Sequence, residues 1–223
     1  MADPDEARRA SPARGRPAAS PFTHEETVLR VGRYRWVEMK LFEALGGWVA
    51  TVPELDVKVL LATHAHHHAF HAGLWHDLLP ARSLTGPAAG MDDLMAAMTE
   101  PRGPSQTIEK LVGVYRVLLP HTIAAYTYHL RTTSDVADQA AIRTIGMILR
   151  DELDDWREAE MHIQSLLTTG ERVERAAACQ VRLERLMVAA GGIAGPGSVG
   201  GRPSAEPEVP APPSERRGAT GGA

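Results

Sequence analysis

The sequence predicts an all-α protein, and three observations support this fold class. Apolar residues recur every three to four positions over four long stretches, which is the spacing of one face of a helix. The stretches that contain Val and Ile show this same spacing and not the alternation typical of strands. Ten of the 16 prolines fall in the two ends of the chain, and most of the others stand where a helical pattern stops. We therefore expect helices joined by loops.

Composition divides the 223 residues into three parts. The segments 1–22 and 190–223 are rich in proline, and the second also holds nine of the 20 glycines. Both are expected to be disordered tails. Residues 23–189 remain as one helical domain, long enough to bury a single hydrophobic core.

Charge and cysteine content exclude several classes of protein. The 24 basic and 28 acidic residues give a net charge of −4, so neither nucleic acid nor a membrane surface is an expected partner. No apolar stretch reaches the roughly 18 residues that cross a bilayer, and the N-terminus lacks the apolar part of a signal peptide. Cys179 is the only cysteine, which rules out an internal disulfide and a Cys-based zinc site. We expect a cytoplasmic protein.

The first two helices are expected over residues 23–50 and 51–80. Thr23 and Glu26 have the spacing of a capping box at the start of the first helix. Thr51-Val-Pro-Glu54 repeats this spacing at the start of the second helix. A turn this short makes the two helices antiparallel neighbours.

A linker over residues 82–104, with at most one short helix around 92–98, separates this pair from a second pair. The third helix is expected over 105–131 with a bend at Pro120, and the fourth over 134–167. The linker is long enough to run along the whole bundle. Two antiparallel pairs joined by one long crossover form the ferritin-like arrangement of a four-helix bundle.

A fifth, shorter helix is expected over residues 171–190. Its apolar side carries Val173, Ala177, Val181 and Leu186. This side is expected to pack on the bundle or on a partner subunit, so a homodimer is one assembly that the sequence admits.

Two glutamates interrupt the apolar stripes of the first and fourth helices. Glu38 lies in the middle of the first stripe, and Glu152 takes the corresponding place in the fourth. An ionised carboxylate in a core costs several kcal/mol unless it is paired, hydrogen-bonded or bound to a metal. Two such groups require a cation between them.

The second helix offers nitrogen ligands, because six histidines lie between residues 64 and 76. At about 100° per residue, some of them face inwards. The inward group is His64, His68 and His71, with His67 just off this face. His66 and His76 fall outside it.

The positions of the glutamates and histidines along their helices place them at one level of the bundle. If the chain reverses at Val52 and Pro53, Glu38 and His68 each lie about 15 residues from the turn. Glu152 is near the midpoint of its own helix. The third helix has no carboxylate in its stripe and contributes a hydroxyl or nothing.

This pattern resembles the ferritin-like di-iron superfamily, in which two helices carry a lone Glu and two carry Glu-x-x-His, all facing inwards. Glu38 matches the lone Glu of the first helix. His68-x-x-His71 stands in the place of one Glu-x-x-His, and Glu152-x-x-Asp155 in the place of the other. The third helix has no matching Glu. The resemblance implies an iron site with one ion or two, and manganese or zinc also suits these ligand types.

The candidate site follows from these residues. The expected metal ligands are Glu38, His64, His67, His68, His71, Glu152 and Asp155. Tyr34 and Tyr115 are the expected catalytic residues beside the metal. The function implied is that of a non-haem iron oxidoreductase, which uses dioxygen or peroxide to oxidise a small organic molecule. Two alternatives remain open: metal storage without turnover, and a metal-free interaction protein with a vestigial site.

Overall fold

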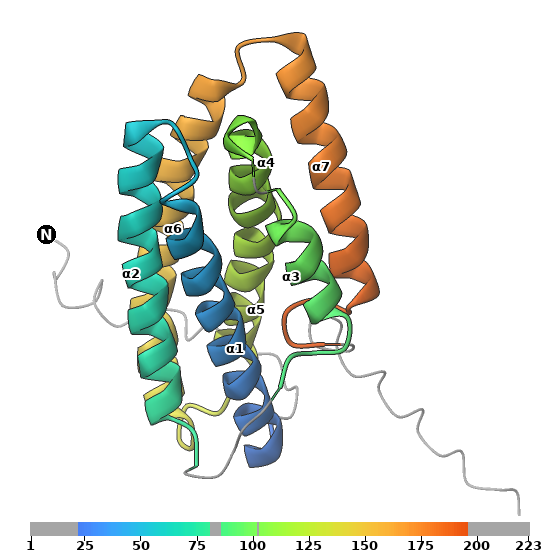
Figure 1. The fold of residues 1–223 in the computed structure, drawn as a ribbon. Helices are drawn as coiled ribbons and strands as arrows, with labels where there is room; N and C mark the ends of the chain where they lie inside the picture. The colour runs from blue at the N-terminus through green and yellow to red at the C-terminus, as the bar shows by residue number, and fades with distance from the viewer. Residues whose placement is uncertain (1–21, 81–85, 102, 196–223) are drawn as a thin grey trace, which may run out of the picture.

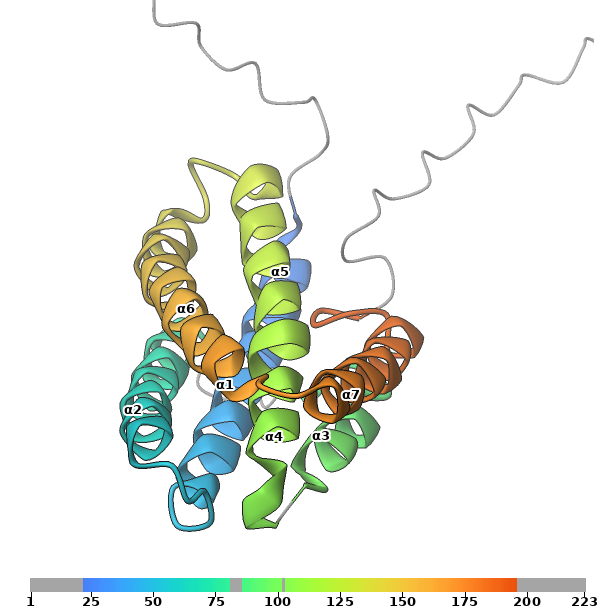
Figure 2. The same ribbon diagram turned by 90° about the horizontal axis from the view of Figure 1, so that it is seen from above.

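The computed structural model of the chain describes residues 22–80, 86–101 and 103–195. All regular secondary structure in these residues is helical, as the sequence predicts. Four long helical segments run side by side around a common core, and two further helices, α3 and α7, pack on the outside (Figures 1 and 2). None of the described helices is both long enough and apolar enough to cross a membrane.

Helices α1 (His24–Trp48) and α2 (Leu55–Asp77) form the first antiparallel pair. The predicted capping box at the start of α1 is confirmed. The Thr23 hydroxyl accepts the Glu26 backbone N–H at 3.2 Å, and the Glu26 carboxylate accepts the Thr23 N–H at 2.8 Å.

The second predicted capping box is wrong. Glu54 precedes α2 but makes no cap, because its carboxylate accepts a hydrogen bond from the Thr107 hydroxyl at 2.8 Å. Thr51 still belongs to the end of α1, where its hydroxyl donates to the Trp48 carbonyl at 3.2 Å. A contact distant in sequence therefore takes Glu54, and a local bond to the preceding turn takes Thr51.

The third long segment is helical throughout but not uniformly α-helical. It consists of a 3₁₀ turn, η1 (Pro104–Gln106), then α4 (Thr107–Val112), a π-helical turn, η2 (Gly113–Leu118), and α5 (Leu119–Thr132). Pro120 has no backbone N–H for the α-helical ladder, and the π-helical turn lies directly before it. The structure shows a π-helical turn just before Pro120, and the bend expected there stays a prediction. Between α2 and this segment lies α3 (Met91–Thr99).

Helix α6 (Gln139–Leu166) begins five residues later than Ser134, its predicted start. The Ser134 hydroxyl accepts the backbone N–H groups of Val136 and Ala137 at 3.3 and 3.2 Å, which closes a turn before the helix. Helices α1 and α6 run in one direction, while α2 and the α4–η2–α5 segment run in the other (Figure 1).

Helix α7 (Gly170–Ala189) is rotated from the predicted orientation: of the four residues expected to pack, only Leu186 contacts the core. Its buried side chains are Ala176, Cys179, Leu183 and Met187. Val173 and Val181, expected to be covered, are 48% and 51% exposed. Both faces of this helix carry apolar residues, so the sequence pattern did not distinguish them.

Residues 190–195, assigned to the C-terminal tail by composition, return to the bundle. Gly191 and Gly192 adopt positive φ angles of 73° and 80° and reverse the chain. Ile193 and Ala194 are then buried, and Arg33 donates to the carbonyl of Ala194. The rest of the two predicted tails, 1–21 and 196–223, lies outside the described residues.

Candidate metal centre

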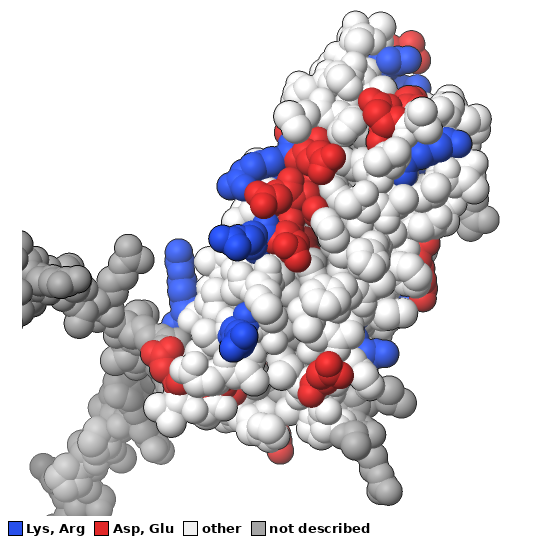
Figure 3. All heavy atoms as spheres, turned by 90° about the vertical axis from the view of Figure 1, so that its left-hand side faces the viewer, with Lys and Arg blue, Asp and Glu red and all other residues white. Residues whose placement is uncertain are grey.

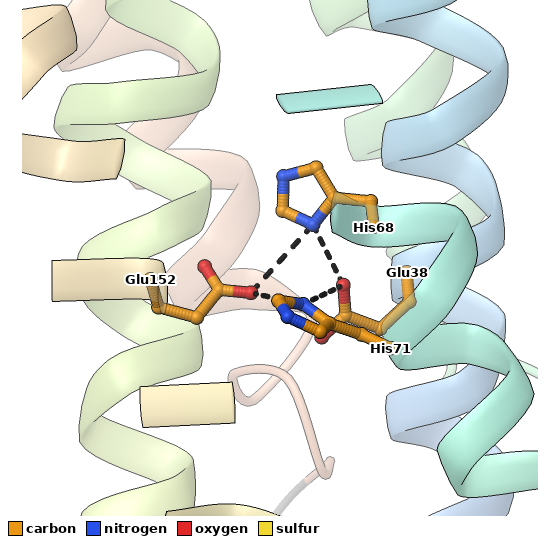
Figure 4. A group of neighbouring side chains, drawn as sticks. All are labelled: Glu38, His68, His71 and Glu152. Carbon is orange, nitrogen blue, oxygen red and sulfur yellow. Dashed lines mark hydrogen bonds and ion pairs between the residues drawn. The ribbon is translucent and has the colours of Figure 1, made fainter. Parts of the chain in front are cut away.

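Four side chains predicted as metal ligands meet in the middle of the bundle. Glu38, His68, His71 and Glu152 each offer one ligand atom, and these atoms all lie within 4.8 Å of one another. All four side chains are completely buried. We call this group the ligand cluster (Figure 4).

Three helices supply the ligand cluster. Glu38 comes from α1, Glu152 from α6, and His68 and His71 from α2, where the i, i+3 spacing directs both rings to one side (Figure 4). The antiparallel turn between α1 and α2 places Glu38 level with His68, as the sequence predicts. His68 Nδ1 lies 2.7 Å from Glu38 Oε2.

The other distances within the cluster suit ligands spaced around a common ion. His68 Nδ1 is 3.6 Å from Glu152 Oε1, and His71 Nδ1 is 3.3 Å from Glu152 Oε1 and 3.6 Å from Glu38 Oε2. Two ligands that bind one metal at about 2.1 Å in tetrahedral positions lie about 3.4 Å apart. His71 Nδ1 and both oxygens of Glu152 are buried without a hydrogen-bond partner. Such unpaired groups are costly in a core, and a cation would satisfy them.

Burial and neighbouring charges shift the pKa values of the cluster residues in different directions. Burial raises the pKa of Glu38, but His68 and His71 outweigh this effect and lower it to about 2. Burial raises the pKa of Glu152, and the negative charge of Glu38 raises it further. Burial lowers the pKa of His71, whereas Glu152 and Glu38 together raise it to about 11. Without a metal, protons on the imidazoles balance the carboxylates.

Two residues that the sequence analysis missed support the ligands from outside. The Tyr126 hydroxyl donates to Glu38 Oε1 at 2.5 Å, and Trp75 Nε1 donates to the Tyr126 oxygen at 3.2 Å. Asp151 Oδ2 lies 3.1 Å from His71 Nε2, so an Nε2–H donated to Asp151 leaves Nδ1 free to face the cluster. Tyr126 lies on α5, in the helix that was expected to contribute a hydroxyl or nothing, and it supplies that hydroxyl.

The remaining predicted ligands form a separate group between α2 and α6. His64 Nε2 lies 3.3 Å from Asp155 Oδ1 and 3.5 Å from Glu158 Oε2. His67 Nδ1 lies 3.0 Å from Asp155. We call His64, His67, Asp155 and Glu158 the second cluster. The structure does not bring His64, His67 or Asp155 into the ligand cluster.

The two predicted catalytic tyrosines are buried, but their hydroxyls pair with histidines outside the ligand cluster. The Tyr115 hydroxyl pairs with His64 Nδ1 at 2.8 Å. The Tyr34 hydroxyl pairs with His129 Nδ1 at 3.2 Å, and its ring packs edge-on against Tyr126. Tyr126, and neither of the predicted pair, is the tyrosine in direct contact with a ligand.

Surface hollows lie elsewhere on the molecule. The hollow between α1 and α3, of about 530 Å³, is lined by residues that include Lys40, Glu43 and Trp48 and by none of the four ligands. The ligand cluster does not line this hollow, and its four side chains are completely buried.

Comparison of the chain with models of protein families, with characterised proteins and with solved structures finds no match. The fold and the site by themselves define the class of this protein. It is a helical bundle with a buried histidine and glutamate cluster that could hold a metal ion.

Proposed function

We propose that this chain is a ferritin-like metalloprotein that binds iron in the ligand cluster and acts as a non-haem oxidoreductase on a small organic molecule, with dioxygen or peroxide as oxidant. The observation that carries this proposal is the convergence of two glutamates and two histidines, all completely buried, on one point of the core. A cation would satisfy the atoms of this arrangement that have no hydrogen-bond partner, His71 Nδ1 and both oxygens of Glu152.

Charge balance supports a divalent ion. Two ionised glutamates and two neutral imidazoles around a dication give a site with no net charge, which removes most of the cost of burying each group. Mixed imidazole and carboxylate ligands suit iron and manganese, and also zinc. Four protein ligands leave coordination positions open for iron, which supplies the activation of dioxygen or peroxide when bound.

The helix arrangement supports the ferritin-like part of the proposal. Helices α1 and α2 form one antiparallel pair, α5 and α6 form the other, and a long connection joins them (Figure 1). Ferritin-like bundles have this connectivity and place their ligands on inward faces at mid-depth. Glu38, His68, His71 and Glu152 occupy such positions.

The protein groups have defined tasks in this chemistry. Tyr126 orients the Glu38 carboxylate and is a proton donor beside it. Asp151 fixes the ring of His71 through Nε2. The apolar surroundings exclude bulk water, which strengthens the electrostatic interactions inside the site.

The test is anaerobic reconstitution of protein purified without a metal-affinity column. After stripping with a chelator, the protein is given Fe(II), and bound iron, thermal stability and dioxygen uptake are measured. We expect bound iron and a higher Tm, because a ligand that binds only the folded state stabilises it. Dioxygen uptake should then occur with the loaded protein and not with the stripped one. Absence of bound iron would refute the metal centre, and bound iron without oxidant uptake would refute the oxidoreductase.

A further inference from the structure

The complete burial of the ligand cluster raises the question of how a cation reaches it. All four ligands are 0% exposed. A divalent ion must exchange its water for protein ligands on the way in, because moving a bare charge through apolar packing costs many kcal/mol. A route therefore needs oxygen or nitrogen ligands between solvent and core.

The second cluster provides such ligands in order of increasing depth. The side chain of Glu158 is 53% exposed, that of Asp155 is 4% exposed, and that of His64 is completely buried. The His64 Nε2 atom lies within 3.5 Å of both carboxylates. His67, 34% exposed, contacts Asp155 from the surface side.

His64 has a ring nitrogen that is available to bind a cation. Its Nε2 is buried and has no hydrogen-bond partner. When Nδ1–H donates to the Tyr115 oxygen, Nε2 carries the lone pair and points between Asp155 and Glu158.

The second cluster adjoins the ligand cluster. His64 precedes His68 by four residues on α2, and Asp155 follows Glu152 by three on α6, so each pair is separated by one helical turn of about 5 Å. The second ring nitrogen of His68 points away from the ligand cluster and is also buried without a partner (Figure 4).

The surface outside this position is acidic. Acidic side chains form a row on the face of the molecule where α2 and α6 lie, with basic side chains along one side of the row and an area without charges on the other (Figure 3). Asp151, Asp154 and Glu158 on α6 are 41%, 68% and 53% exposed. Such a row attracts cations and raises their local concentration.

We propose that His64, Asp155 and Glu158, with His67 at the rim, form a transit site through which a divalent cation passes from solvent to the ligand cluster. The proposal rests on the metal-binding part of the proposed function. The transit site binds the ion briefly and passes it inwards, so it affects the rate of loading and not the final metal content.

The experiment measures loading of the stripped full-length protein with Co(II), whose visible absorption changes when it takes nitrogen and oxygen ligands in the protein. Rates are followed by stopped flow, and final content by elemental analysis. Glu158→Gln and Asp155→Asn should each slow loading, by about tenfold for the first, and leave one Co(II) per chain at equilibrium. The rate should fall with salt less steeply in Glu158→Gln than in the parent.

Asp154→Asn is the matched control. Asp154 belongs to the same acidic row, but its carboxylate pairs with Arg157 at 2.7 Å and is not part of the second cluster. Glu158→Gln changes a half-exposed side chain, so we expect this variant to fold like the parent. Asp155 is buried, so circular dichroism is used to check that Asp155→Asn is folded.

Three results would overturn the transit site. Unchanged loading rates in both variants would show that the ion enters elsewhere. Equal slowing in Asp154→Asn would assign the effect to surface charge alone. A second Co(II) held at equilibrium and lost with Asp155→Asn would make the second cluster a resident metal site. A parent protein that takes up no metal is a different outcome, because it refutes the metal centre as well.

Discussion

The two central glutamates have unequal surroundings, and their variants should differ accordingly. Glu38 is hydrogen-bonded to His68 and Tyr126, whereas neither oxygen of Glu152 has a hydrogen-bond partner and its closest ion pair, to His71, is 3.3 Å long. Glu38→Leu should destabilise the metal-free protein by about 3–5 kcal/mol, because it strands buried imidazolium charge. Glu152→Leu should leave the metal-free protein as stable as before or more stable, because it removes a buried carboxylate that has no hydrogen-bond partner and lies beside Glu38.

Urea unfolding in the presence of a chelator measures this difference. Both variants should also fail to bind metal, which elemental analysis checks. Glu43→Gln, at a surface pair with Lys40, is the control and should change neither property. Equal loss of stability in the two leucine variants would contradict the asymmetry that the structure shows.

The histidine-rich part of α2 allows a second comparison at single-residue scale. His68 is completely buried in the ligand cluster, whereas His66 is exposed on the other side of the helix. His68→Ala should lower bound metal sharply, and His66→Ala should leave it unchanged, as determined by elemental analysis of both proteins after the same reconstitution. Similar metal content in the two variants would exclude His68 as a ligand.

His129 should make the fold sensitive to acid independently of any metal. Burial, and then the charge of Arg30, lower its pKa from 6.5 to about 4, although Asp138 opposes this shift. The unfolded chain takes up the proton first, so stability is complete above pH 6.5 and is lost as the pH falls towards 4. The loss from this group amounts to about 3 kcal/mol, at about 1.36 kcal/mol per pKa unit.

His129→Leu isolates this contribution. Because the hydrogen bond to Tyr34 is lost, the variant should be less stable at neutral pH. Its free energy of unfolding should nevertheless fall less steeply between pH 6.5 and 4 than that of the parent. Parallel pH profiles from chemical denaturation of the two proteins would show that His129 does not titrate as the buried environment requires.

At the scale of elements, two helical glycines should respond in opposite ways to alanine. A Cβ at Gly113, in the π-helical turn, would lie 2.8 Å from Met98 Cγ and 3.1 Å from Leu183 Cδ1. Overpacking of this contact with α3 and α7 should cost about 1–3 kcal/mol, which exceeds the gain in helix propensity. A Cβ at Gly146 in α6 meets nothing within 4 Å, so alanine should stabilise the fold by up to about 1 kcal/mol.

Thermal unfolding of Gly113→Ala and Gly146→Ala tests this expectation, with a lower Tm for the first and a higher Tm for the second. An increase in Tm for both variants would mean that the side chains of α3 and α7 move aside at little cost to accept a methyl group at Gly113. The outer helices would then be loosely attached to the bundle.

At the scale of the whole molecule, the boundary of the folded unit lies beyond the segment that composition delimits. A chain of residues 22–195 should unfold with the same free energy as the full chain, because the removed segments are rich in proline and glycine and offer little apolar surface. A chain of residues 22–189 should be less stable, because it lacks the buried Ala190, Ile193 and Ala194. Equal stability of the two truncated chains, measured by urea unfolding, would show that residues 190–195 contribute nothing.

The all-helical fold class and the approximate helix positions followed from the sequence, because periodicity and proline positions are local properties. Periodicity also identified Glu38 and Glu152 as carboxylates on apolar stripes. The short turn between α1 and α2 then placed Glu38 level with His68, since antiparallel helices of equal rise keep residues equidistant from the turn together. These steps require no knowledge of distant contacts.

Only the tertiary structure decided which polar groups belong to one cluster. His64 lies on the inward face, as predicted, and Asp155 is buried as well, but both lie one turn away from the four ligands. A helical wheel does not show this axial offset. The support from Tyr126 and Asp151 depends on the rotation of neighbouring helices about their axes. The packed face of α7 and the cap partner of Glu54 likewise depend on chain segments distant in sequence. Local patterns fix where helices form and which residues share a face, whereas the contacts between faces are properties of the packed bundle.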